Sequence, residues 1–72
     1  MAEQPIKTEI TGKVWKIEVA VGDKVAEEDP IMILESMKME IPVLAPGSGT
    51  VKQILVGEGD AVTEGQTVAV IS

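Results

Sequence analysis

A lysine between two methionines is the feature of this sequence most able to take part in chemistry. Met37-Lys38-Met39 lies inside the stretch LESMKMEI, which runs from Leu34 to Ile41. The chain contains no histidine and no cysteine, so the commonest general base and the best nucleophile are missing. The usual zinc ligand sets are missing for the same reason. We therefore expect no metal site and no reaction catalysed by this chain alone.

The amine of Lys38 is predicted to be a substrate for another enzyme. An ordinary lysine amine is almost fully protonated at pH 7, so the other enzyme would have to activate it. Methionine side chains are flexible and polarizable, so Met37 and Met39 suit a docking surface that adapts to its partner. The alternative interpretation is a solvated turn lysine beside two methionines that fill gaps in the core.

The elements that position this lysine follow from an internal repeat. Thr11–Glu35 aligns without a gap on Ser48–Ser72, 37 residues further along, and the identical pairs include Gly12/Gly49 and Val14/Val51. Gly22-Asp23 falls on Gly59-Asp60, which is a turn signal because glycine tolerates positive φ and aspartate bonds nearby backbone. The shared features are hydrophobic pattern and turn residues, which together specify a backbone.

Each copy is predicted to be β-structure. Strict alternation of Trp15, Ile17, Val19 and Val21 with Val14, Lys16, Glu18 and Ala20 indicates a half-buried strand. The corresponding strand of the second copy begins near Val51, the repeat partner of Val14. The other predicted strands are 5–10, 31–34, 39–44 and 67–71, with very short strands around Val25 and Val62, which makes eight. The sequence therefore predicts an all-β fold, a flattened β-barrel or sandwich of two four-stranded antiparallel sheets related by a pseudo-two-fold axis.

The repeat also predicts where Lys38 lies. It falls in the junction between the copies, and the equivalent junction is the gap between the two chain ends. We expect the termini at one pole of the fold and Lys38 at the opposite pole, on a tight hairpin. Residues 35–38 would form the turn, without the glycine or Asn-Gly pair that such turns favour. We therefore expect that a requirement other than turn formation determines which residues occupy these positions.

Composition restricts the function classes further. Residues 1–72 are expected to form a single domain, with half-repeats at about 11–35 and 48–72. A net charge of −6 and a single aromatic residue, Trp15, argue against nucleic-acid binding. No segment approaches the run of about 18 apolar residues typical of a membrane span. The N-terminal MAEQPIKTEI does not resemble a secretory signal, so a cytoplasmic location is expected.

The motif Ser36-Met37-Lys38-Met39-Glu40, in a chain built from two β half-repeats, resembles the biotinyl domain family. It is most similar to the small free-standing biotin/lipoyl attachment proteins, over nearly the whole chain. The resemblance implies that Lys38 receives biotin from a biotin protein ligase and that Met37 and Met39 help the ligase to recognise it. Glu35, Ser36 and Glu40 supply the hairpin context, although the family usually has alanine where this chain has Ser36.

The implied function is that of a biotin carboxyl carrier, which shuttles a carboxyl group between separate biotin carboxylase and carboxyltransferase active sites. Biotin supplies the chemistry and the protein supplies tethering. Two alternatives stay open. Lipoyl domains share the repeat and place their lysine on the same hairpin, so lipoate is the alternative modification of Lys38. The other alternative is a small β-domain that binds a partner without being modified.

Overall fold

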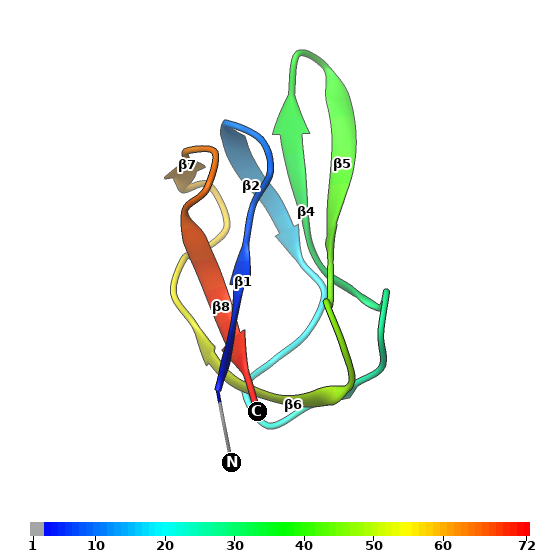
Figure 1. Cartoon of the computed structure of the whole chain (residues 1–72). Coiled ribbons are helices and arrows are strands. Elements are labelled where there is room, and N and C mark those ends of the chain that lie inside the picture. The colour runs from blue at the N-terminus through cyan, green and yellow to red at the C-terminus, as the bar shows by residue number, and fades with distance from the viewer. Residues whose placement is uncertain (1–2) are drawn as a thin grey trace.

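The computed structural model describes residues 3–72, and every regular element in that range is a β-strand (Figure 1). The short strands follow from the period-2 hydrophobic pattern and from turn residues between them. The eight strands are β1 (Gln4–Lys7), β2 (Gly12–Ile17), β3 (Lys24–Val25), β4 (Pro30–Ser36), β5 (Met39–Leu44), β6 (Gly49–Ile54), β7 (Ala61–Val62) and β8 (Thr67–Ile71).

The strands form two four-stranded antiparallel sheets, one in the order β1-β8-β6-β3 and the other in the order β5-β4-β2-β7. Advancing each strand by four places converts one order into the other, so the two sheets are related by the predicted pseudo-two-fold axis. The sheets are not joined by strand pairing, and among the described residues they do not close into a continuous barrel. The two-sheet prediction is confirmed, in its sandwich form.

The core lies between the two sheets and is built from both copies of the repeat. Equivalent residues Val14 and Val51 are both almost fully buried, as are Ile31 and Val68. Such a small core leaves little margin, so the loss of even one buried methyl group should be measurable. The buried apolar residues are Ile6, Val14, Val25, Ile31, Met32, Leu34, Val43, Ala45, Val51, Val62, Val68, Ala69 and Ile71.

The strict alternation predicted for the first long strand is interrupted. In the pairing of β2 with β4, Val14 lies opposite Leu34 and Lys16 lies opposite Ile33, which leaves Trp15 as an extra residue. Because of this bulge, Val14 faces the core and Trp15 does not: Val14 is buried whereas Trp15 is 49% exposed. β6 has the same irregularity after Val51, so both copies share the bulge. The strand also ends at Ile17, short of the predicted Val21.

The Gly-Asp turns form as expected. Gly22 and Gly59 have φ values of 97° and 93°, where a residue with a Cβ would be strained. The carboxylate of Asp23 accepts a hydrogen bond from the backbone N–H of Ala20, and that of Asp60 does the same three residues back. These contacts explain the repeated turn residues by their effect on the backbone alone.

The β4–β5 hairpin lies at the pole opposite the start of β1 and the end of β8, as the repeat predicts (Figure 1). At the lower pole Gln4 pairs with Ile71, and the Thr50 N–H donates to the carbonyl of Ser72 at 2.8 Å. The hairpin extends beyond the β1–β2 connection at the upper pole. Residue 1, the repeat equivalent of Lys38, lies outside the described residues. No helix that could cross a membrane is found in the part of the chain that the structure describes.

Candidate functional site

The hairpin that carries Lys38 has a turn of only two residues. Ser36 pairs with Met39, so Met37 and Lys38 alone connect β4 to β5. Both have positive φ, 52° for Met37 and 66° for Lys38, as a type I′ turn requires. The predicted four-residue turn is wrong in its length, because Glu35 and Ser36 continue the ladder of β4. The prediction of a tight hairpin is confirmed.

Side chains at the tip point into solvent. Met37 is 91% exposed and Met39 is 61% exposed, so neither fills a gap in the core. Lys38 is exposed as well. Within residues 3–72, its ammonium group takes part in neither of the two salt bridges and in no side-chain hydrogen bond. The amine is therefore accessible to a second protein, with an exposed thioether on each side of it.

Two features of the hairpin weaken it locally. A left-handed backbone conformation at a residue other than glycine costs roughly 1–2 kcal/mol, and the turn contains two such residues. Glu35 and Glu40 lie directly opposite each other on β4 and β5, a placement of like charges that destabilises a strand pair. On the other side of β4, Lys13 of β2 lies opposite Glu35. These residues are therefore not the ones that hairpin stability alone would select.

The base of the hairpin is anchored by packing in spite of these costs. Leu34 is fully buried and its strand partner Ile41 is half-buried, which anchors both strands one pair below the carboxylates. On the β2 side, a Cβ built on Gly12 would come within 2.6 Å of the Glu35 carbonyl oxygen. Gly12 thus permits a close approach that no other residue would allow. The result is a firm stem beneath an exposed tip.

Sequence reasoning identified the tip but missed the role of Gly12. The signal was present, since Gly12 and Gly49 are an identical pair in the repeat. Gly49 approaches the Ser72 carbonyl in the same way, at 2.8 Å from a built Cβ. Only the paired strands show that each glycine lies against the last strand of its own half-repeat. Among residues 3–72, no group of three acidic side chains gathers closely enough to hold a metal ion.

Comparison with known proteins agrees with this geometry. Residues 4–71 match the model of the Biotin_lipoyl family, which is described as "Biotin-requiring enzyme". The match spans nearly the whole chain, so the chain belongs to this family, and it is a non-catalytic carrier domain of the biotinyl type.

Full-length relatives and a solved structure give the same assignment. The chain is 44% identical over 72 residues to the "Biotinylated protein TB7.3 homolog" of Mycobacterium leprae, with 100% of both chains covered. It is 42% identical to the "Biotin/lipoyl attachment protein" of Bacillus subtilis, covering 93% of this chain and 92% of that protein. It superimposes on part of the Kluyveromyces lactis urea carboxylase with a TM-score of 0.94 and 43% identity, covering 100% of this chain and 6% of that one.

Proposed function

We propose that residues 1–72 act as one carrier domain in which biotin is attached covalently to Lys38. The observation that carries the proposal is the isolated amine of Lys38, exposed at the tip of a tight hairpin at the pole opposite the start of β1 and the end of β8 (Figure 1). Similarity to a protein described as biotinylated supports the choice of modification. The attached group supplies carboxyl-transfer chemistry, and the domain tethers that group and binds the partner enzymes.

Attachment would make an amide between the biotin carboxyl carbon and Nζ of Lys38. The ligase would activate that carboxyl group and accept a proton from the ammonium, and the activating group would leave with its electron pair as the C–N bond forms. Met37 and Met39 would contact the ligase, since their exposed thioethers flank the amine. Glu35, Ser36 and Glu40 would set the backbone that presents them.

The proposed partners are a biotin protein ligase and the biotin carboxylase and carboxyltransferase of a biotin-dependent carboxylase. The likeness to part of a urea carboxylase supports partners of this class. A tether of this kind raises the concentration of the ring at each active site to roughly millimolar without tight binding. We place the carrier in the cytoplasm, in keeping with a chain that has no cysteine.

The proposal is tested by intact mass spectrometry after co-expression with a biotin protein ligase. Wild type should gain the mass of one biotin less one water, and Lys38→Arg should gain nothing. Lys7→Arg is a matched control, because Lys7 is also exposed but lies on β1. A biotin adduct that persists in Lys38→Arg would show that the attachment site is wrong.

A parallel co-expression with a lipoate ligase tests the second modification. The full-length relative described as a biotin/lipoyl attachment protein is the observation that keeps lipoate in view. Exposed methionines on both sides of Lys38 favour biotin. A lipoyl adduct without a biotin adduct would reverse the assignment, and an unmodified chain that still supports its partners would favour the simple binding module.

A further inference from the structure

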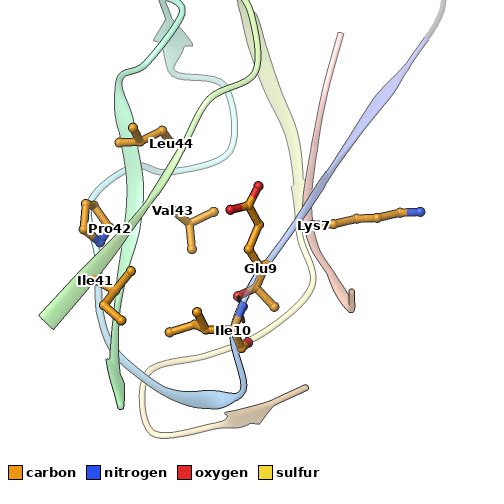
Figure 2. A pocket seen from close by; sticks show the side chains of 8 residues that line it. Lys7, Glu9, Ile10, Ile41, Pro42, Val43 and Leu44 are labelled. Atoms are coloured by element: carbon orange, nitrogen blue, oxygen red, sulfur yellow. Dashed lines mark hydrogen bonds between the residues drawn. The ribbon is translucent and has the colours of Figure 1, made fainter. Parts of the chain in front are cut away.

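The two sheets leave an opening between their edge strands β1 and β5. Two hollows lie along this opening, and the pseudo-two-fold axis relates one to the other. The first, near the Lys38 pole, has a volume of about 240 Å³ and lies between β5 and the β1–β2 connection (Figure 2). Its lining residues are Lys7, Thr8, Glu9, Ile10, Ile41, Pro42, Val43 and Leu44. We call it the hairpin hollow.

The second hollow is the symmetry equivalent of the first, nearer the chain ends, and is wider at about 470 Å³. Most residues of the hairpin hollow have repeat partners there, for example Pro42 with Pro5 and Val43 with Ile6. Ile10 and Ile41 are the exceptions. Their repeat partners are Gly47 and Gln4, and neither lines the second hollow. Glu27 and Glu28 line it instead, so the pair Ile10 and Ile41 belongs only to the hollow near Lys38.

Ile10 and Ile41 lie at the same end of the hairpin hollow in Figure 2, on opposite walls. Both are half-buried, which leaves apolar surface available to a further group. Ile10 is held in place by Thr8, whose buried hydroxyl donates to the Ile10 carbonyl at 3.0 Å and accepts from the Ile10 N–H at 3.1 Å. Glu9 points into the hollow and Lys7 points away from it (Figure 2). The site is an apolar slot with one carboxylate at its side.

The hollow is within reach of a group on Lys38. Ile41 is three residues from Lys38 along β5, which corresponds to about 10 Å at the usual strand rise. A biotinyl-lysine arm has eleven bonds between Cα and the ring, roughly 14 Å when extended, by standard bond lengths. The volume equals that of about eight liquid waters at about 30 Å³ each, which is enough for a small fused ring.

From this geometry we propose that the hairpin hollow is a resting site for the ring at the end of the Lys38 arm. This inference rests on the proposed biotinylation. The apolar face of the ring packs between Ile10 and Ile41, and a ring N–H donates to the carboxylate of Glu9. Part of the ring stays in solvent, so the contact is weak and the arm leaves readily for an active site. At rest, the hollow shields the ring from unproductive encounters.

The experiment uses the full chain, with its isoleucine methyl groups labelled for NMR, before and after biotinylation confirmed by intact mass. We expect NOEs from the biotin ring to the methyls of Ile10 and Ile41. Their chemical-shift changes on modification should be several-fold larger than those of Ile54, which lies on β6. Methyl shifts of Ile10 and Ile41 that change no more than that of Ile54, with no ring NOE, would overturn the proposal while leaving biotinylation intact. A chain that takes no biotin would overturn both proposals.

A pair of substitutions gives a second test, in which the amide spectrum checks that the chain stays folded. Ile10→Gly with Ile41→Gln gives the hairpin hollow the residues found at the equivalent positions near the chain ends. It should return the chemical shifts of the biotin ring protons to those of free biotinyl-lysine, while the biotin mass is kept and the amide spectrum stays folded. Leu55→Gln is the matched control, since Leu55 is an exposed apolar residue that lines neither hollow. Ring proton shifts that stay displaced after the double change would assign the contact to another surface and overturn the proposal.

Discussion

Gly12 on β2 lies so close to Glu35 on β4 that a Cβ added to it would come within 2.6 Å of the Glu35 carbonyl oxygen. That added Cβ would also lie 3.3 Å from the Cβ of Ser36. Both neighbours belong to the strand that leads into the Lys38 turn. The position of the exposed amine therefore depends on a missing side chain in the adjacent strand.

The first prediction concerns Gly12→Ala. The new methyl group meets backbone, which cannot rotate away, so the free energy of unfolding in urea should fall by about 1–3 kcal/mol. The base of the hairpin should shift as well, and biotinylation by the ligase should be slower. Time courses of intact mass, recorded well below the unfolding temperature, measure that rate.

Two glycine variants separate these effects. Gly49→Ala meets the Ser72 carbonyl at 2.8 Å and should destabilise the fold to a similar extent without slowing modification, since it lies at the other pole. Gly47→Ala finds its nearest atom at 3.7 Å and should change stability by no more than about 0.5 kcal/mol. Slower modification in Gly49→Ala would mean that global stability, rather than hairpin geometry, controls the rate.

Much of the fold could be predicted because the same hydrophobic pattern and turn residues occur in both half-repeats. The eight strands, the two sheets and the opposite poles follow from hydrophobic period and turn residues, which are local properties. The bulge at Trp15 could not be predicted from these local properties, because it is a shift in the pairing of β2 with β4 that leaves no mark in the hydrophobic pattern. Its recurrence after Val51 shows that both copies share it.

The tip of the hairpin was predicted in place but not in form. Met37 and Lys38 have no propensity for left-handed backbone, so turn chemistry alone favours a longer loop over a type I′ turn. The strand pairing on both sides, anchored by the buried Leu34, imposes that conformation. The contact between Gly12 and Glu35 depends on two strands far apart in sequence, so no local pattern could predict it.

A second prediction tests the bulge through neighbouring residues. Val14 is 1% exposed, so Val14→Ala should lower the free energy of unfolding by about 2 kcal/mol, from lost burial and the cavity left behind. Trp15→Ala removes a far larger side chain but should cost less than Val14→Ala, because Trp15 is 49% exposed and its removal leaves no closed cavity. Urea titrations followed by far-UV circular dichroism measure both. Strict alternation, with Trp15 inward, predicts the opposite order.

A third prediction concerns the strained turn. Replacing Met37-Lys38 with Asn-Gly, by Met37→Asn and Lys38→Gly, should raise the free energy of unfolding by about 1–2 kcal/mol, because these residues suit positive φ. Urea unfolding measures the gain, and the attachment site is lost. Lys38→Ala removes the same charge but keeps a Cβ, so it should give no such gain. An equal gain in Lys38→Ala would assign the effect to charge.

A fourth prediction uses an asymmetry between the copies. Glu28 has a φ of 72°, and its repeat partner Gly65 has a φ of 84°. Glu28→Gly should therefore stabilise the fold by about 0.5–1 kcal/mol, the relieved strain exceeding the entropy that glycine adds to the unfolded chain. Gly65→Ala should destabilise it by about 1 kcal/mol. Thermal unfolding checks both, with Glu27→Gly as the control that should lose stability.

The last prediction concerns Thr8, which is the one buried polar residue among residues 3–72, at 2% exposure. Its hydroxyl satisfies both the N–H and the carbonyl of Ile10, so Thr8→Val keeps the shape of the side chain but leaves these groups unpaired. The free energy of unfolding should fall by about 1–3 kcal/mol, since unsatisfied buried polar groups are costly. Thr63→Val, at an exposed position, should change it by no more than about 0.5 kcal/mol.

Thr8→Val should also move Ile10 away from Ile41 and so weaken the contact with the biotin ring, whereas the rate of biotinylation should not change because the turn at Lys38 is untouched. Methyl NOEs and intact-mass time courses on the same variant measure the two effects separately. Slower biotinylation with unchanged NOEs would contradict the assignment of Thr8 to the hollow and connect it to the hairpin instead.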